Sequence, residues 1–370
     1  MASRVGLDAF LNAHTMPAAP DLVREEEGAV RCVACANRCL IPEGKRGICR
    51  VRFNRGGELR VPDGYVAGLQ VDPIEKKPFF HAYPGRDALS FGMLSCNLHC
   101  PFCQNWLSSQ VMREAHSVSE PRACRPEELV AVAVDRGAPL LVSTYNEPLI
   151  TSDWAARVFE CAVDKGLVCG YVSNGYASEE VLEFLRPWLR LCNVDLKCFD
   201  DEHYGTLGGR LKDVCDTIER LKSLDIWVEV ITLVVPGFND GDVELRSIAE
   251  FIAGVSPDIP WHVTAFHPDY RMKDGRRTSA KDLDRAYTAG KEAGLRYVYA
   301  GNLPGGVGDR ENTYCHSCNA LLIERMGFYV TQNRMQGDRC PDCDARIAGV
   351  WEDEPPRAGP GRGHVRFLGG

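Results

Sequence analysis

The sequence has no hydrophobic run long enough to cross a lipid bilayer, which takes about 18 apolar residues or more. Its first residues, MASRVG, have no apolar core of the kind found in secretory signal peptides. Basic residues are not in excess, since 43 Lys and Arg stand against 51 Asp and Glu, a formal net charge of −8. These absences predict a cytoplasmic protein that partners neither a membrane nor a nucleic-acid polymer, whose phosphates are bound mainly by basic side chains.

Cysteine, by contrast, is abundant, with 17 residues in a chain of 370. Disulfide frameworks of that kind belong to small secreted proteins, and this chain is too long for that class. An apolar fraction of 45% and a charged fraction of 25% are ordinary for a soluble globular protein. We therefore expect reduced cysteines that serve as metal ligands.

The central cysteine cluster has three members and lacks a fourth. Cys96, Cys100 and Cys103 lie within eight residues, just after the apolar run 88–94. Thiolates select zinc, copper(I) or iron–sulfur clusters, and a four-iron cluster held by three thiolates keeps one iron free for an outside ligand. A zinc knuckle would need a fourth ligand, and the nearest candidate, His99, is awkwardly spaced. The triad therefore predicts a catalytic 4Fe–4S cluster.

An N-terminal group of four cysteines precedes the triad: Cys32, Cys35, Cys39 and Cys49. They lie on a tight turn and a return segment whose glycines let backbone amides approach the sulfurs. Four thiolates suit an auxiliary 4Fe–4S cluster and a structural zinc ion equally well. Both interpretations stay open at this point.

A C-terminal group consists of two Cys-x2-Cys knuckles, Cys315 with Cys318 and Cys340 with Cys343. A hairpin-like stretch at 321–330 separates them. This arrangement is typical of a zinc ribbon, in which four thiolates close a structural site. We expect zinc there in preference to a cluster.

Between residues 88 and 300, short apolar runs alternate with amphipathic segments such as 126–136 and 152–165, each followed by a glycine. The apolar runs are 88–93, 140–144, 167–173, 191–196, 226–235, 261–266 and 295–300. Strict alternation predicts parallel strands joined by right-handed crossovers. The expected fold class is therefore α/β, closing fully or partly into a barrel.

Polar residues follow or occupy the ends of these predicted strands, where functional side chains gather in such folds. The first strand leads into the cysteine triad. The others carry Tyr145, Asn146, Glu147, Ser173, Asn174, Asp195, Lys197, Glu229, Thr232, His262, Thr264 and His267. Buried polar groups need partners, and a cofactor with an ammonium, a carboxylate and a ribose would supply several.

Three further residues are candidates for catalysis. Lys76 and Lys77 lie between prolines ahead of the triad and would face an anionic substrate; a solvated charged turn is the alternative. Cys198 follows Lys197 at a strand end, which favours thiol or hydrogen-atom chemistry there. The remaining cysteines lie mostly in apolar contexts and are expected to be small buried hydrophobes. They are Cys124, Cys161, Cys169, Cys192 and Cys215.

Taken together, several motifs resemble the radical S-adenosylmethionine (SAM) enzymes of the AmmeMemoRadiSam system, which are relatives of the activating enzymes of pyruvate formate-lyase. The motifs are DPIEKKP at 72–78, CNLHCPFCQN at 96–105, YNEP at 145–148, NGY at 174–176, DLK at 195–197 and GN at 301–302. The resemblance extends from about residue 28 to residue 352. The family usually has threonine where this chain has Asn146, a departure that leaves the general chemistry intact and the substrate open.

The resemblance implies a partial (β/α)6 radical-SAM barrel with an N-terminal Cys-rich extension and a C-terminal four-cysteine ribbon. It also implies that the central triad binds the cluster and that SAM binds beside it. The implied SAM contacts are Phe102 at the adenine, Asn146 and Glu147 at the ammonium, Ser173 and Asn174 at the ribose, Asp195 and Lys197 at the carboxylate, with Tyr145 and His267 as further contacts.

By the same resemblance, the enzyme cleaves SAM reductively to a 5′-deoxyadenosyl radical, which abstracts hydrogen from a small, anionic metabolite. An electron donor such as flavodoxin or ferredoxin would reduce the cluster. One alternative is auxiliary-cluster-dependent sulfur insertion or oxygen-to-sulfur exchange on a nucleotide or sugar phosphate, which the richness in thiols motivates. A second is an activase of a glycyl-radical enzyme, although the two added cysteine modules would crowd the barrel mouth that a partner needs. A third is a non-redox zinc-binding module.

The expected domains are a Cys-rich extension at 1–85, a core barrel at 86–305, a zinc-ribbon-like module at 306–352 and a disordered tail at 353–370. A short helix is expected at 7–12. The tail is rich in Pro, Gly and charge and cannot bury a core.

Overall fold

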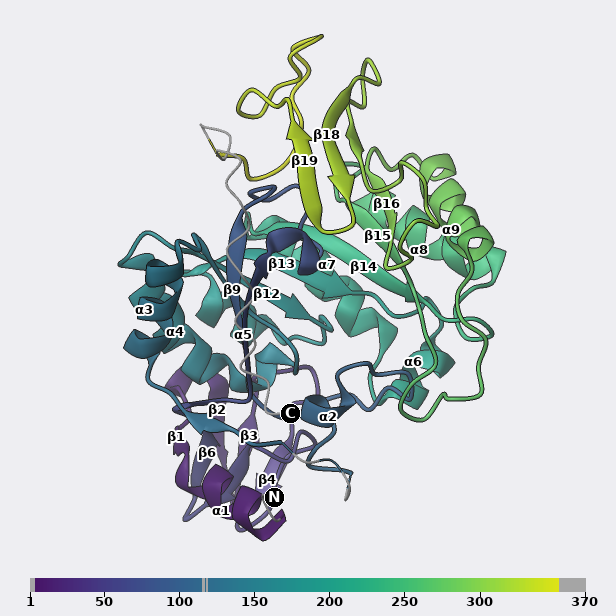
Figure 1. Cartoon of the computed structure of the whole chain (residues 1–370). Helices are drawn as coiled ribbons and strands as arrows, with labels where there is room; N and C mark the ends of the chain where they lie inside the picture. The colour runs from purple at the N-terminus through teal and green to yellow at the C-terminus, as the bar shows by residue number, and fades with distance from the viewer. Residues whose placement is uncertain (1–3, 115–116, 118, 353–370) are drawn as a thin grey trace.

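The computed structural model describes residues 4–114, 117 and 119–352, and the tail expected at 353–370 lies outside these described residues. At its centre is an eight-stranded sheet in the order β16-β15-β14-β13-β12-β11-β9-β8 (Figure 1). Its strands are β8 (Gly68–Pro73), β9 (Asp87–Gly92), β11 (Leu140–Ser143), β12 (Val168–Ser173), β13 (Leu189–Asp195), β14 (Trp227–Val234), β15 (Trp261–Ala265) and β16 (Val298–Gly301). The strands from β9 to β16 are parallel and follow chain order, which confirms the predicted α/β fold. The order has two ends, β8 and β16, so the barrel is partial.

Helices cover the outer face of the sheet and bury one apolar side each. α3 (Pro126–Arg136) ends at Gly137, whose φ of 65° gives the left-handed C-cap that the sequence predicts. On α4 (Ser152–Val163), Trp154 and Phe159 pack edge-to-face against Phe91 of β9. The other helices of the core are α5 (Glu179–Leu185), α6 (Asp201–Leu207), α7 (Leu211–Ser223), α8 (Asp242–Val255) and α9 (Ala280–Glu292). In the described part of the chain, no helix has the length and apolar character that a membrane span needs.

The edge strand β8 is antiparallel to β9, with register from Gly68 opposite Gly92 to Pro73 opposite Asp87. This strand is not among those predicted from the sequence, because its residues are half polar and lie outside the series of apolar runs. A short 3-10 helix, η2 (Ile74–Lys76), follows directly. β8 thereby brings the DPIEKKP motif to the end of the sheet.

The N-terminal module consists of α1 (Arg4–Ala13) and small antiparallel sheets (purple to blue in Figure 1, apart from the later strand β10). These contain β1 (Thr15–Pro17), β2 (Val23–Glu26), β3 (Ala29–Cys32), β4 (Leu40–Pro42), β5 (Phe53–Arg55), β6 (Glu58–Pro62), and the pair β7 (Tyr65–Val66) and β10 (Arg122–Ala123). Arg52 fastens the module to the core, because its buried guanidinium pairs with Asp153 of α4 and donates to the Ile150 carbonyl at 2.8 Å.

The C-terminal ribbon contains β17 (Thr313–Tyr314) and the hairpin of β18 (Leu321–Met326) and β19 (Tyr329–Asn333), as the sequence predicts. It follows β16 in the chain but returns to the segment after β8. Arg325 donates to the Phe80 carbonyl at 2.8 Å, and Val350 forms a β-bridge with Ala82. The ribbon therefore joins the two ends of the open sheet, and we call these contacts the clasp.

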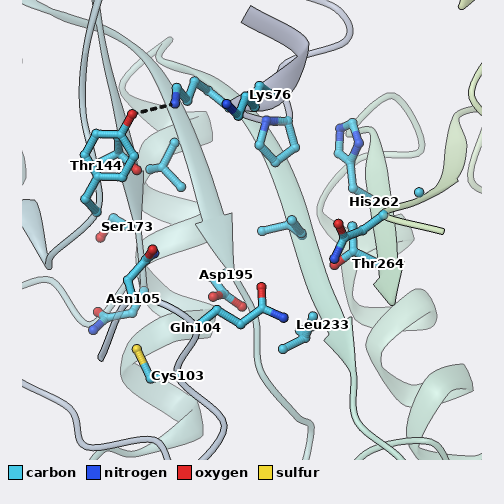
Figure 2. Close-up of a pocket in the computed structure, with 18 of the residues that line it drawn as sticks. Lys76, Cys103, Gln104, Asn105, Thr144, Ser173, Asp195, Leu233, His262 and Thr264 are labelled. Carbon is cyan, nitrogen blue, oxygen red and sulfur yellow. Dashed lines mark hydrogen bonds between the residues drawn. The ribbon is translucent and has the colours of Figure 1, made fainter. Parts of the chain in front are cut away.

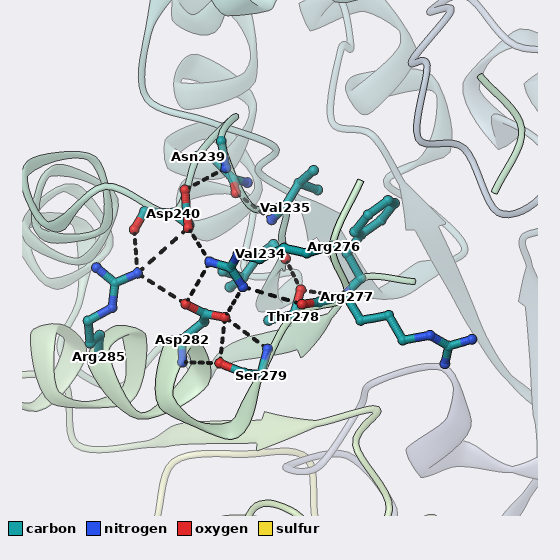
Figure 3. Close-up of polar contacts among 12 residues, drawn as sticks. Val234, Val235, Asn239, Asp240, Arg276, Arg277, Thr278, Ser279, Asp282 and Arg285 are labelled. Atoms are coloured by element: carbon teal, nitrogen blue, oxygen red, sulfur yellow. Dashed lines mark hydrogen bonds and ion pairs between the residues drawn. The ribbon is translucent and has the colours of Figure 1, made fainter. Parts of the chain in front are cut away.

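A polar network fixes the loop between β15 and α9 (Figure 3). Asp282, in the first turn of α9, accepts hydrogen bonds from the backbone and hydroxyl of the N-cap Ser279 and pairs with Arg276. Earlier in the same loop, the backbone amide of Arg271 donates to the Pro101 carbonyl in the cysteine loop at 3.1 Å. The network thus supports a segment that lies against the central cysteine triad.

Candidate active site

A cavity of about 480 Å³ lies over the carboxyl ends of the parallel strands. In the view of Figure 2, Lys76 and Cys103 lie at opposite ends of it, with Asp195 between them. Its volume is typical of a site for one cofactor and a small substrate. The predicted residues that line it are Lys76, Lys77, Cys96, Cys100, Phe102, Cys103, Tyr145, Asn146, Glu147, Ser173, Asn174, Asp195, Lys197, His262 and Thr264.

The three cysteines of the loop after β9 fit a cluster with one open iron. Cys96 Sγ accepts from the backbone amide of Leu98 at 3.3 Å, and Cys103 Sγ lies 3.1 Å from the Ser109 hydroxyl. His99 does not join them, because its ring packs against Gly208 at the end of α6. Burial raises the pKa of the Cys100 thiol to about 12, so ionising these thiols is costly unless a metal binds. The donor set therefore suits an iron–sulfur cluster.

Glu147, at the end of β11, is the most constrained acidic group in the cavity. Its carboxylate accepts from the Ser173 hydroxyl at 2.7 Å, the Asn174 amide at 2.8 Å and the Leu149 amide at 3.0 Å. Burial raises the pKa of Glu147 to about 7. A carboxylate has about four acceptor sites, so one stays available for an ammonium group in the cavity.

Asp195 and Lys197, at the end of β13, form an ion pair with 2.5 Å between Oδ2 and Nζ. Burial alone would lower the pKa of Lys197, but the charge and hydrogen bond of Asp195, together with the nearby Cys100, hold that pKa well above its usual value. Asp195 Oδ1 is buried and has no hydrogen-bond partner among the described residues. A donor from a bound ligand would satisfy it.

Three of the predicted cofactor contacts act within the protein. Asn146 Oδ1 accepts from the Met93 amide at 2.9 Å, and its Nδ2 donates to the Glu147 carbonyl at 3.1 Å. The Ser173 hydroxyl is engaged with Glu147. Asn174 Nδ2 donates to Asn97 Oδ1 at 2.8 Å and lies 3.6 Å from Cys96 Sγ. These side chains position Glu147 and the cysteine loop.

Tyr145 lies on the wall of the cavity in a left-handed backbone conformation, with φ of 71°. Its hydroxyl accepts from Lys77 Nζ at 3.0 Å and donates to Gln70 Oε1 at 3.1 Å. Gly92 makes room for it: a Cβ there would meet the Thr144 carbonyl oxygen at 2.5 Å and Tyr145 Cβ at 2.9 Å. The close approach requires glycine.

Lys76 and Lys77 share Asp72, with Nζ at 2.9 Å from Oδ1 and 3.4 Å from Oδ2, respectively. The Lys77 side chain is only 4% exposed, so the interpretation as a solvated turn is wrong for this residue. Burial lowers the pKa of Lys77 to about 8. Lys76 is 38% exposed and lines the cavity, and it shares the single negative charge of Asp72 with Lys77.

A buried hydrogen-bond network forms the wall behind the cavity. Of its members, Glu229 and His262 are among the residues predicted from the sequence. Glu229 accepts from His262 Nε2 at 2.7 Å and from the backbone amides of Phe80 and His81, both at 2.9 Å. Glu229 itself does not line the cavity in the part of the chain that the structure describes, whereas His262 does. Tyr299, Glu311 and Phe328 also line the cavity and had no signal in the sequence.

Four predicted residues, Glu229, Thr232, His267 and Cys198, are not among the residues that line the cavity in the described part of the chain. His267 Nδ1 is 2.9 Å from Nε2 of Gln104, a residue that lines the cavity. His267 is therefore connected to the cavity through Gln104. Cys198 is fully buried, and its thiol contacts the Asp200 carbonyl at 3.7 Å. The structure therefore gives no support to the thiol chemistry predicted for Cys198.

The two outer cysteine groups differ in geometry. Among the described residues, only the C-terminal group has its sulfurs all within 4.8 Å of one another. Two of the sulfur–sulfur distances are 3.6 Å (Cys315 to Cys343) and 3.7 Å (Cys318 to Cys340). The N-terminal cysteines instead surround a separate small pocket of about 10 Å³.

Residues 92–252, which run from the end of β9 into α8, match the family model of the radical SAM superfamily. The chain belongs to the radical SAM superfamily. The uncharacterized protein MJ0808 of Methanocaldococcus jannaschii is 37% identical over 87% of this chain and 96% of its own length. The isethionate sulfite-lyase activating enzyme of Oleidesulfovibrio alaskensis is 25% identical over 32% of this chain and 40% of its own.

Solved structures of radical SAM proteins are also similar. A radical SAM methyltransferase from Sphaerobacter thermophilus has 14% sequence identity and a TM-score of 0.46, covering 82% of this chain and 84% of that one. A domain of a pyruvate-formate lyase-activating enzyme from Bacteroides vulgatus has 17% identity and a TM-score of 0.38, covering 44% of this chain and 98% of that one. Membership of the superfamily makes this chain an enzyme, so the non-redox zinc-module hypothesis is wrong. The AmmeMemoRadiSam subfamily stays a prediction.

Proposed function

We propose that this radical SAM enzyme abstracts hydrogen from a small, anionic metabolite. The observation that carries the proposal is that one cavity joins three cluster-binding thiols, a constrained carboxylate at Glu147 and a cationic side chain at Lys76. When bound, the 4Fe–4S cluster and SAM supply the 5′-deoxyadenosyl radical. The protein binds and orients both reactants and keeps water from them.

The polar groups of the cavity are suited to the parts of SAM. Glu147 has an acceptor site left for the methionine ammonium, and Lys197 is the cation for the methionine carboxylate. The unpartnered Asp195 oxygen suits a hydroxyl donor such as the ribose. Phe102 provides an apolar surface for the adenine. Each assignment matches the charge, hydrogen-bonding capacity or apolar surface of a side chain to one part of SAM.

The remainder of the cavity suits a small substrate. On the side of the cavity formed by η2 and β15, Lys76 offers an ammonium group. His262 offers an imidazole ring there, whose Nε2 is bonded to Glu229. Gly327 and Phe328 of the ribbon line the same cavity, which narrows the mouth. A glycyl-radical partner would have to insert a polypeptide loop past the ribbon, so we favour a small molecule over the activase alternative.

The C-terminal group is proposed to hold structural zinc. A tetrahedral ion with Zn–S bonds of about 2.3 Å places its sulfurs about 3.8 Å apart, close to the observed distances. This zinc would hold the ribbon in the shape that lines the cavity.

The proposal is tested on protein reconstituted with iron and sulfide under anaerobic conditions, with dithionite as the reductant and 5′-deoxyadenosine as the product measured. Cys96→Ala should abolish the product, whereas Cys169→Ala, at a buried cysteine of β12 outside the cavity, should retain it. Product from the Cys96→Ala variant, or none from the wild type, would overturn the proposal.

The substrate class has its own test. Deuterium transfer from labelled candidate metabolites into 5′-deoxyadenosine should occur for anionic compounds and not for their neutral analogues. Lys76→Gln should raise KM for such a substrate about 10-fold, the loss of one charged hydrogen bond, and leave substrate-free SAM cleavage unchanged. Equal use of neutral analogues would contradict the anionic class.

A further inference from the structure

We propose that the N-terminal cysteine group holds a second 4Fe–4S cluster that relays electrons to the catalytic cluster, and that Asn97 connects the two. The inference rests on the proposed function, because a relay needs a catalytic cluster to reduce. It decides between the roles that a second cluster could have: relay, substrate anchor or sulfur donor.

The spacing of the sulfurs favours a cluster over zinc. Cys32, Cys35, Cys39 and Cys49 all line one pocket, yet they do not form a compact group like that of the ribbon. The catalytic triad is likewise not compact, among the residues that the structure describes. A four-iron cluster is wider than a single ion and keeps its cysteine sulfurs farther apart. The two sites that lack compact sulfurs are therefore the two suited to clusters.

Hydrogen-bond donors surround the pocket, and one of them lacks an acceptor. The side-chain nitrogen of Asn37, which lines the pocket, is buried and has no hydrogen-bond partner among the described residues. Arg52 Nη1 lies 3.6 Å from Cys32 Sγ, and the Ile48 amide donates to Cys39 Sγ at 3.5 Å. Cluster sulfides and thiolates accept such bonds, and N–H groups around them tune the cluster potential. A bound cluster would supply the acceptor that the Asn37 amide lacks.

Asn97 connects this pocket to the catalytic triad. It directly follows Cys96 and is completely buried. Its Oδ1 lies 3.7 Å from Cys96 Sγ and accepts from Asn174, while its amide lies beside the Cys35 sulfur. In addition, the Ser95 hydroxyl donates to the Cys49 carbonyl. The two cysteine groups are therefore connected through Ser95 and Asn97 by a path of few covalent and hydrogen bonds.

The pocket does not open to the substrate. None of the four N-terminal cysteines is among the residues that line the large cavity, within the described ranges. A substrate anchor or a sulfur donor must reach the substrate radical, which forms in that cavity. The position behind the cysteine loop therefore favours electron relay over sulfur insertion or oxygen-to-sulfur exchange.

The outer surface of the pocket offers an entry point for electrons. Leu40 and Ile48, next to Cys39 and Cys49 in the chain, are exposed by 49% and 50%. Three basic residues of the same segment, Lys45, Arg46 and Arg50, are exposed against one exposed acidic residue, Glu43, in a protein of net charge −8. An apolar patch with a basic rim fits a small acidic electron-carrier protein of the flavodoxin or ferredoxin class. The carrier gives up one electron, and the second cluster accepts it and passes it to the catalytic cluster. No proton is transferred, and no covalent bond forms or breaks.

The first test counts metals and records electron paramagnetic resonance (EPR) spectra of reduced protein. About eight irons per chain are expected in the wild type and about four in Cys32→Ala/Cys35→Ala, since each cluster holds four irons. SAM should perturb only the signal that survives in the double variant. Zinc in place of the missing irons would overturn the proposal. Product formation with dithionite by the wild type tests the proposed function separately.

The second test compares electron sources. The Cys32→Ala/Cys35→Ala variant should lose at least 10-fold in 5′-deoxyadenosine formation driven by reduced flavodoxin, and stay within about threefold of the wild type with dithionite. Leu40→Glu and Ile48→Glu should show the same selective loss with all eight irons retained. Leu107→Glu is the matched control, because Leu107 is 53% exposed beside the cysteine triad. A loss caused by Leu107→Glu alone would show direct electron entry and contradict the relay.

The sulfur-donor role makes a different prediction for the wild type. Acid-labile sulfide should stay constant over many turnovers if the second cluster only carries electrons. Loss of sulfide in step with a sulfur-containing product would overturn the relay. An Asn97→Leu variant should keep both clusters and both EPR signals but lower the flavodoxin-driven rate more than the dithionite-driven rate.

Discussion

At the scale of single residues, Glu147 combines a structural and a ligand-binding role. Three donors from two neighbouring strand ends hold its carboxylate in place. Burial then makes the charged form costly, which is why its pKa rises to about 7. A bound ammonium group would stabilise the charged form of the carboxylate. Glu147 is therefore held in a position in which it can bind a cation.

Glu147→Gln should weaken SAM binding by about 10- to 100-fold, the value of one hydrogen bond to a charged group. Because the wild-type carboxylate must be ionised, its SAM affinity should fall as pH is lowered through 7, whereas the variant should show no such dependence. Equilibrium binding to reconstituted protein measures both. Glu160→Gln, at an exposed position of α4, is the control, and equal affinities for wild type and Glu147→Gln would refute the role.

Gly92→Ala should destabilise the protein by about 1–3 kcal/mol, because the added methyl group would overlap the Thr144 carbonyl oxygen and Tyr145. Chemical denaturation followed by circular dichroism measures the change. Gly254→Ala in α8 is the matched control, since a Cβ there meets nothing within 4 Å. It should be neutral or stabilising by about 0.5–1 kcal/mol. Similar results for the two variants would contradict the steric argument.

At the scale of elements, the β15–α9 loop depends on the first turn of α9. Ser279 and Asp282 form a reciprocal capping box, and Arg276 adds a charge from the loop itself (Figure 3). The hydrogen bond from Arg276 is the main reason why the pKa of Asp282 lies well below its usual range. The loop is thereby anchored next to the cysteine triad.

Asp282→Asn should lower the free energy of unfolding by about 1 kcal/mol at pH 7, the usual effect of a lost cap. A depressed folded-state pKa stabilises the protein above the unfolded pKa of about 3.9. The difference between wild type and variant should therefore shrink as pH falls below about 4. Asp284→Asn, on the same helix but half exposed, should change little. A difference that persists unchanged at pH 3 would exclude the electrostatic explanation.

The parallel strands could be predicted because each is buried on both faces and reads as an apolar run. The cysteine triad and the cavity residues Tyr145, Asn146, Glu147, Ser173, Asn174, Asp195 and Lys197 followed from their positions at strand ends. β8 could not be predicted in this way, because its polar and apolar residues alternate and it pairs only at the sheet edge. The contacts of Asn97 and Arg325 depend on segments distant in sequence, which local patterns do not reveal.

At the scale of the whole molecule, the clasp makes the C-terminal ribbon part of the active-site wall. Arg325 is buried between the ribbon and the sheet, with its guanidinium 4.2 Å from the centre of the Phe80 ring. Its Nε lies 3.6 Å from a carboxylate oxygen of Glu75, and burial raises the pKa of Glu75 to about 7. The shape of the cavity therefore depends on a four-cysteine module outside the barrel.

Cys318→Ser/Cys343→Ser should remove about one zinc per chain, the content of a closed four-thiolate site, and leave the iron content unchanged. The substrate KM should rise, because Gly327 and Phe328 lose their fixed position, while substrate-free SAM cleavage should continue. Metal analysis and steady-state kinetics measure these effects. Met326→Ala, at a residue 71% exposed on the same hairpin, should match the wild type. A fall in iron would mean that the ribbon holds a cluster.

The clasp also sets the order of events during synthesis. The cysteine triad leaves the ribosome long before Val350, which pairs with Ala82 to complete the clasp. At roughly 5–20 residues per second, the interval amounts to tens of seconds. Throughout that time the clasp cannot hold Gly327 and Phe328 against the cavity that they line, so the cavity stays open on the ribbon side until synthesis is almost complete.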